Sequence, residues 1–129
     1  MTAIVASLAL AIPPGWHVTT ASVTTITNPA ERFVLYSGAA PRPGGDPRAR
    51  QVVAVVMEQR APELSLFPLR PRRFRLRRPG TMENWKGSRW DELVFRQHHR
   101  AFYVFVGIGT CADAQVPTLL DALDSIRVS

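Results

Sequence analysis

The stretch that decides the fold is residues 90–108, WDELVFRQHHRAFYVFVGI. Two runs of strand length, Trp90 to Arg96 and Ala101 to Ile108, are rich in aromatic and β-branched residues and are separated by Gln97–Arg100. The pattern predicts an antiparallel hairpin. Because side chains alternate across a strand, one face of the second strand carries Phe102, Val104 and Val106, and the other carries Tyr103, Phe105 and Gly107.

Upstream of this hairpin the sequence predicts more strands. Gln51–Gln59 is apolar on both faces, which is typical of a central strand covered on both sides. Arg32–Ser37 and the Thr- and Val-rich run Val18–Ile26 read as further strands. Ile4–Ile12 reads as one buried first strand, which Pro13, Pro14 and Gly15 end.

After Gly109 the apolar period changes to that of an amphipathic helix, with Pro117 in its first turn. Its apolar stripe consists of Leu119, Leu120, Leu123 and Ile126. We therefore expect one globular domain over residues 1–129, with a mobile loop at about residues 38–50. The expected fold is α+β, an antiparallel sheet of about six or seven strands with the C-terminal helix packed on one face. A β-sandwich with an added helix is the alternative.

The same patterns predict the core, because the hairpin turns one face inward and the helix has one apolar stripe to cover it. The residues expected to be buried together are Trp16, Val53, Val55, Phe102, Val104, Val106, Leu120, Leu123 and Ile126.

Three segments carry a resemblance to a known family. Ile12-Pro13-Pro14-Gly15-Trp16 opens the domain, Phe102 to Gly109 forms an apolar strand ending in glycine, and Leu120 to Val128 closes it with a leucine–aspartate–serine pattern. This order resembles small bacterial domains of the PsbP-like superfamily. The resemblance implies an antiparallel sheet flanked by helices. It also implies a binding or accessory role rather than catalysis, although fold alone does not carry function.

Positive charge is concentrated in one segment. Six of the sixteen basic residues fall within nine positions, and the rest of the chain has ten bases and ten acids, so the net charge of +6 is local. We call these six residues the arginine stripe: Arg70, Arg72, Arg73, Arg75, Arg77 and Arg78. A localised stripe of this kind is an electrostatic footprint for an anionic partner.

The segment Arg73–Arg77 alternates between arginine and apolar residues, which predicts a strand with Arg73, Arg75 and Arg77 on a wet face. We expect the stripe to bind an acidic surface of another protein. The solvated face of an edge strand is one alternative. Nucleic acid is another, less favoured because Phe74 alternates to the opposite face and offers no stacking surface beside the arginines.

No catalytic constellation is predicted. Cys111 is the single cysteine, no signature flanks it, and no Cys/His ladder exists. His98 and His99 share a turn, where neighbouring side chains seldom converge on a metal. Gly107 and Gly109 precede the helix but lack the Gly-Lys-Ser/Thr ending of a phosphate loop. We therefore expect no catalytic residue, no cofactor and no metal, and keep a ligand-binding or enzymatic pocket between sheet and helix as an alternative.

The N-terminal apolar run also bears on location. Ala3–Ile12 has no Lys or Arg before it and is shorter than the roughly 20 residues that span a bilayer. We expect neither a signal peptide nor a membrane span, and a cytoplasmic protein. With 46% hydrophobic and 20% charged residues the chain has an ordinary globular composition, which excludes a disordered tail. No pattern indicates an oligomeric state.

Overall fold

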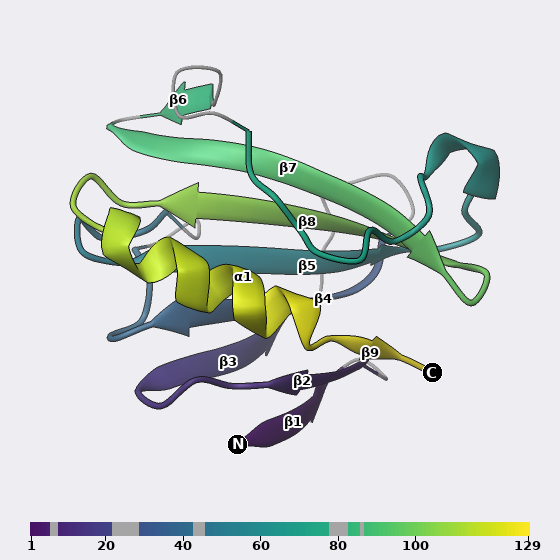
Figure 1. The fold of residues 1–129 in the computed structure, drawn as a ribbon, viewed down its shortest axis with the longest axis horizontal. Coiled ribbons are helices and arrows are strands. Elements are labelled where there is room, and N and C mark those ends of the chain that lie inside the picture. Colours follow the sequence, from purple (N-terminus) through teal and green to yellow (C-terminus); the bar gives the residue numbers. More distant parts are fainter. Residues whose placement is uncertain (6–7, 22–28, 43–45, 78–82, 86) are drawn as a thin grey trace.

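The computed structural model describes residues 1–5, 8–21, 29–42, 46–77, 83–85 and 87–129. Figure 1 shows two antiparallel sheets and a C-terminal helix that lies across one face of the larger sheet. The larger sheet has the strand order β3-β4-β5-β8-β7-β6, and the smaller has the order β1-β2-β9. The predicted α+β fold, an antiparallel sheet with a C-terminal helix on one face, is confirmed.

The strands are β1 (Thr2–Val5), β2 (Leu8–Ala11), β3 (Trp16–Ala21), β4 (Pro29–Ser37), β5 (Val52–Gln59), β6 (Glu83–Trp85), β7 (Ser88–Gln97), β8 (Arg100–Ile108) and β9 (Arg127–Val128). The helices are α1 (Val116–Asp124) and the short 3-10 turns η2 (Leu64–Leu66) and η4 (Asp113–Gln115). No helix in the described part of the chain is both long and apolar enough to cross a membrane.

The predicted hairpin is present as β7 and β8, with Trp90 opposite Gly107 and Phe95 opposite Phe102. Its two-residue turn is made by His98 and His99, whose φ angles are 52° and 61°. Positive φ at both central residues belongs to the turn type whose twist matches a right-handed strand pair, and histidine tolerates that conformation better than branched residues do.

The main core lies between one face of the six-stranded sheet, α1 and the three-stranded sheet. Phe102, Val104 and Val106 of β8 face α1, and Leu119, Leu123 and Ile126 meet them from the C-terminal segment. Leu8, Leu10 and Val128 close the core from the small sheet. One continuous apolar cluster therefore joins the two sheets and the helix.

The two residues of β5 that were predicted to lie in the core are on the wrong face of the strand. On β5 the residues that face α1 are Val52, Ala54 and Val56, because Ala54 pairs with Val106 of β8. Val53 is buried on the opposite face, and Val55 is half-buried there. A strand that is apolar on both faces does not reveal by alternation which face is inward.

Two other residues of the predicted core, Leu120 and Trp16, are less buried than the sequence predicted. Leu119, rather than Leu120, is fully buried, since 119, 123 and 126 form an equally regular helical stripe. Leu120 and Trp16 are half-buried and pack against the edge of the core.

The N-terminal segment is a hairpin and not the single strand that the sequence predicted. β1 and β2 pair antiparallel, with Val5 opposite Leu8. Leu8 and Leu10 are buried, whereas Ile4 is 81% exposed. The apolar run Ile4–Ile12 contains no Gly, Pro, Asn or Asp, so its composition predicted one strand where the structure has two.

The predicted loop at residues 38–50 is described except for residues 43–45. Its ends are joined by the side chain of Gln51, which donates to the carbonyl oxygens of Ser37 and Ala39 at 2.8 and 2.5 Å. Arg48 Nε also donates to the Ala40 carbonyl at 2.9 Å. These bonds fasten the loop to the start of β5. The predicted strand Val18–Ile26 corresponds to β3 up to Ala21, and residues 22–28 lie outside the described part.

Candidate functional site

The described part of the segment that carries the arginine stripe, residues 70–77, is not a strand, so that prediction is wrong. Residues 70–77 cross the helix-side face of the six-stranded sheet beside β7 (Figure 1), and only Leu69 forms an isolated bridge, with Arg96. Arg70 N donates to the Arg96 carbonyl beside this bridge, but two backbone donors further along the segment go to carboxylates instead. Phe74 N donates to Asp124 Oδ1 at 2.8 Å, and Arg77 N donates to Asp91 Oδ2 at 2.7 Å.

The alternation of this segment is nevertheless retained. Phe74 is buried and Leu76 is half-buried, while Arg73 and Arg75 are exposed. The ring of Phe74 lies 5.3 Å from that of Phe95 between centroids, and Phe95 stacks on Phe102 at 5.0 Å. The inward residues of the segment therefore extend the main core, which fixes the direction in which the arginines between them point.

Arg70 turns inward and closes the end of α1. Its guanidinium donates to the Asp124 carbonyl at 2.9 Å, to the Ile126 carbonyl, and to Gln97 Oε1 at 3.0 Å. It also lies 5.5 Å from the centroid of the Phe74 ring. Burial lowers the pKa of Arg70, and the negative charge of Asp124 partly offsets that effect. Arg70 satisfies carbonyls that the helix end leaves without partners, so its role is structural.

Arg77 is also engaged within the fold. Its Nε donates to Asp91 Oδ1 at 2.6 Å, and the side chain of Asp91 is only 2% exposed. The same carboxylate accepts from the backbone N of Glu92 at 2.8 Å. Because an isolated carboxylate is costly to bury, Asp91 needs these donors, and Arg77 is the cation that compensates it.

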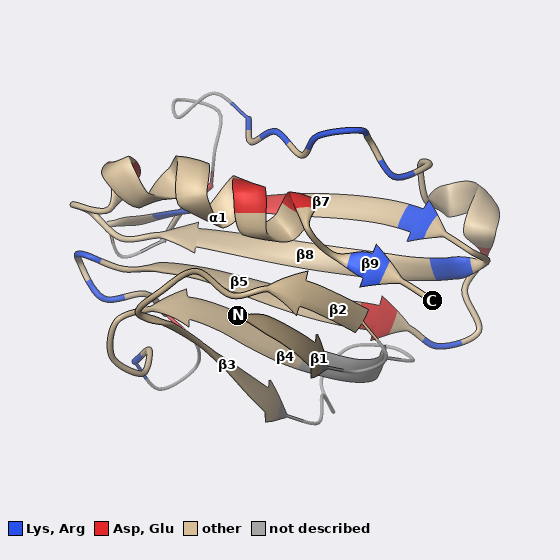
Figure 2. Cartoon of the chain, turned by 60° about the horizontal axis from the view of Figure 1, so that its bottom comes forward, with Lys and Arg blue, Asp and Glu red and all other residues tan. Residues whose placement is uncertain are grey.

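Arg72, Arg73 and Arg75 are the described members of the stripe that face solvent without an internal partner, whereas Arg77 is exposed but paired with Asp91. All three are exposed, and none has a hydrogen bond or ion pair with another residue of the described segments. We call them the outer arginines. The blue trace along the rim of Figure 2 shows the stripe segment beside the helix-side face of the sheet. Arg78 lies outside the described residues.

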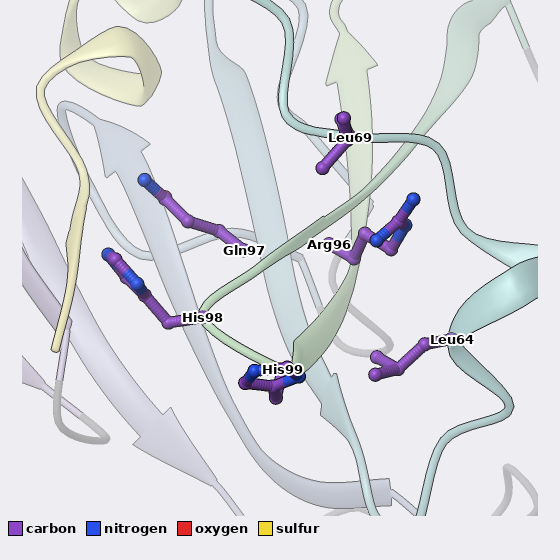
Figure 3. A pocket seen from close by; sticks show the side chains of 6 residues that line it. All are labelled: Leu64, Leu69, Arg96, Gln97, His98 and His99. Carbon is purple, nitrogen blue, oxygen red and sulfur yellow. The ribbon is translucent and has the colours of Figure 1, made fainter.

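A hollow of about 280 Å³ opens beside the start of the stripe, at the turn between β7 and β8 (Figure 3). It is lined by Leu64, Leu69, Arg96, Gln97, His98 and His99. Leu69 is 68% exposed, and Leu66 of the adjacent η2 is 71% exposed. Arg96 Nε is held by the Phe67 carbonyl at 2.8 Å. Exposed leucines next to fixed basic groups make this end of the molecule suited to an amphipathic partner.

His98 and His99 do not gather with other potential metal ligands in the described part of the chain. His98 and His99 point in different directions from the turn (Figure 3). Asp91 is occupied by Arg77, and Cys111 follows the far end of β8, about 27 Å along an extended strand. Among the described residues, no three His, Cys, Asp or Glu side chains gather closely enough to hold a metal ion.

Gly107 and Gly109 lie at positions where other groups pack directly against the backbone. A Cβ on Gly107 would lie 2.7 Å from an atom of the Trp90 indole, and one on Gly109 would collide with the Arg48 and Ala49 carbonyl groups. Backbone donors near them are also used, since Gly109 N donates to Gln51 O at 2.9 Å and Cys111 N donates to Ala49 O at 2.7 Å. A phosphate loop needs such N–H groups free, so this turn does not have that character.

Sequence reasoning missed a second hollow, of about 260 Å³, on the sheet face opposite α1. It is lined by Asp46, Glu83, Trp90 and Phe105. Two strands of the hairpin, the short strand β6 and a loop contribute one residue each. The sequence signal that could have pointed to this hollow is the predicted hairpin, because its register places Trp90 directly opposite Gly107.

No family model matches this chain, and neither a curated protein nor a solved structure matches it.

Proposed function

We propose that this protein is a non-enzymatic binding module that recognises an acidic surface of another protein through the outer arginines Arg72, Arg73 and Arg75. The observation that carries this proposal is the division of the arginine stripe. Arg70 and Arg77 are used to hold the segment down, whereas the three arginines between them are exposed. Arginine presents a planar fork that binds carboxylates through two parallel hydrogen bonds.

The way the segment is held favours binding. Phe74 is buried, its N–H is fixed by Asp124, and the N–H of Arg77 is fixed by Asp91. The backbone that carries the outer arginines is thus ordered before any partner arrives. Binding then requires the ordering of three side chains and not of a loop, which lowers the entropic cost of association.

The surroundings of the stripe favour a protein partner over nucleic acid. Leu66 and Leu69 are exposed at its beginning, and an acidic protein segment can place an apolar side chain there. The aromatic residue within the stripe, Phe74, is turned into the core and is not available for base stacking. A binding or accessory role is also what the resemblance to the PsbP-like superfamily implies.

The test compares two anionic probes of equal formal charge, by fluorescence anisotropy. One is a labelled peptide that alternates glutamate with leucine, and the other is a labelled single-stranded oligonucleotide. We expect the peptide to bind about tenfold or more tightly than the oligonucleotide at about 150 mM salt. Tighter binding of the oligonucleotide, with an affinity that falls steeply with salt, would favour the phosphate-binding alternative and overturn the proposal.

A further inference from the structure

The second hollow combines two aromatic rings with two carboxylates. Trp90 of β7 and Phe105 of β8 form its floor, Glu83 lies opposite Trp90 in the β6–β7 ladder, and Asp46 approaches from the loop before β5. It lies on the face of the six-stranded sheet away from α1, because Phe105 alternates with Val104 and Val106, which face the helix. The arginine stripe lies on the other face.

The orientation of Trp90 follows from its contact with Gly107. A Cβ on Gly107 would lie 2.7, 2.8 and 2.9 Å from three consecutive carbon atoms of the six-membered ring of Trp90. A point beyond the ring edge would be much closer to the middle atom than to its neighbours. The near equality of the three distances therefore places Gly107 against the flat face of the indole, and the opposite face is turned away from the sheet.

The ring of Phe105 is oriented by its contact with a neighbouring ring, that of Tyr103. Its ring lies 6.4 Å from that of Tyr103, with an angle of 14° between the ring planes, so the two rings stack along the same face of β8. Both Trp90 and Phe105 are partly exposed. The negative faces of aromatic rings attract cations, most strongly for tryptophan.

The two carboxylates have no compensating group within the described part of the chain. Neither Asp46 nor Glu83 has a side-chain hydrogen bond or ion pair with another described residue. In contrast, Glu58 is paired with Arg100 at 2.6 Å and Asp91 with Arg77 at 2.6 Å. In a protein of net charge +6, two acids that pair with no described cation and lie beside two aromatic faces favour a cationic ligand.

We propose that this hollow binds a small organic cation that carries an alkylated ammonium group. The aromatic faces attract its charge and contact its methyl groups, and the carboxylates supply the counter-charge. A metal ion fits less well, because it needs about six oxygen ligands and the walls offer two carboxylates and hydrocarbon. A neutral ligand would remove water from the carboxylates without compensation.

The test titrates the protein with choline and with its neutral isostere 3,3-dimethylbutan-1-ol, and follows the indole N–H signals by NMR. The Trp90 signal is assigned from its absence in Trp90→Phe. We expect a saturable shift of the Trp90 signal with choline, and at least about a fivefold weaker response to the alcohol. Trp16, which packs against the core on the helix side, is the internal control and should not shift.

Isosteric variants separate charge from shape. Asp46→Asn and Glu83→Gln keep the size of the side chain and should each weaken choline binding about threefold to tenfold. Glu63→Gln, an exposed acid at the start of η2, is the matched control and should bind like the parent. Phe105→Leu should weaken choline binding more than either carboxylate variant does, because it removes one of the two aromatic faces.

Two results would overturn the proposal: equal binding of choline and the neutral alcohol, or unchanged choline binding in both carboxylate variants with the parent melting temperature retained. Neither result depends on the arginine stripe, since the outer arginines lie on the opposite face of the sheet.

Discussion

Arg77 and Asp91 form an ion pair in which the Nε of the arginine lies 2.6 Å from Oδ1 of an almost fully buried acid. The other carboxylate oxygen accepts from the backbone N–H of Arg77 at 2.7 Å, so one acid of β7 holds both the backbone and the side chain of the stripe segment. At the other end of that segment Arg70 closes α1. The outer arginines are presented between these two anchors.

Asp91→Ala should therefore destabilise the protein by about 2–3 kcal/mol, because it leaves the backbone N–H groups of Arg77 and Glu92 without their acceptor in a partly buried position. Urea denaturation gives the free energy of unfolding directly. Glu92→Ala, at the neighbouring exposed position, is the control and should change that free energy by about 0.5 kcal/mol or less. An Asp91 variant as stable as the control would show that the anchor is not needed.

Arg70→Met should lower the free energy of unfolding by about 2–3 kcal/mol, since the carbonyls at the end of α1 lose their donor. Arg72→Met keeps the same change in charge at an exposed position and should be nearly neutral. If both variants melt alike, Arg70 does not cap the helix.

The effect of Arg70→Met should not change between pH 6 and pH 9. Burial lowers the pKa of Arg70, so the folded state favours the deprotonated form more than the unfolded state does. The stability that this confers grows only as the pH rises through strongly alkaline values and is absent below them. Denaturation curves of parent and variant at three pH values measure the difference, and a slope within the neutral range would contradict this assignment.

The sequence predicted the hairpin and the helix because each depends on contacts within one short stretch. The β7–β8 turn and the helical period after Gly109 are local patterns, and the two hairpin strands begin and end within about two residues of the predicted positions. The division of the arginine stripe could not be predicted in this way. The acceptors that select Arg70 and Arg77 are the Asp124 carbonyl and the Asp91 carboxylate, 54 and 14 residues away along the chain.

The alternation of Arg73–Arg77 fitted a strand equally well, and only the packing of Phe74 on Phe95 shows that this segment covers the sheet. The second hollow shows the same limit, because it joins a loop, a short strand and the hairpin. In the sequence, Gly107 stands out only as a glycine at the end of a strand that precedes the helix. Its contact with Trp90 across the hairpin becomes visible only once the register is known.

Leu123→Ala should cost about 2–5 kcal/mol, because its side chain is completely buried between α1 and the sheet. Leu120→Ala removes the same atoms from a half-buried position on the same helix and should cost about 1 kcal/mol or less. Thermal melting of the two variants measures the contrast. Equal losses would mean that the helix is rotated relative to the arrangement described above.

Gly109→Ala should be more damaging than Gly107→Ala. The new methyl group at position 109 would meet the backbone of Arg48 and Ala49, which cannot move without breaking the bonds of that turn, and the cost should exceed about 3 kcal/mol. At position 107 the obstacle is the Trp90 ring, which can tilt, so a cost of about 1–3 kcal/mol and a shifted indole signal are expected. The reverse order of stabilities would contradict these contacts.

The most direct measurement of the central claim compares two triple variants of equal net charge for binding to the same glutamate–leucine peptide. One replaces Arg72, Arg73 and Arg75 with Ser, and the other replaces Arg42, Arg60 and Arg127, which are also exposed but scattered. If the outer arginines are the binding surface, the first variant should lose about tenfold or more in affinity and the second about twofold, at unchanged melting temperature. Equal losses in both would show that net charge alone attracts the peptide, and would contradict the account.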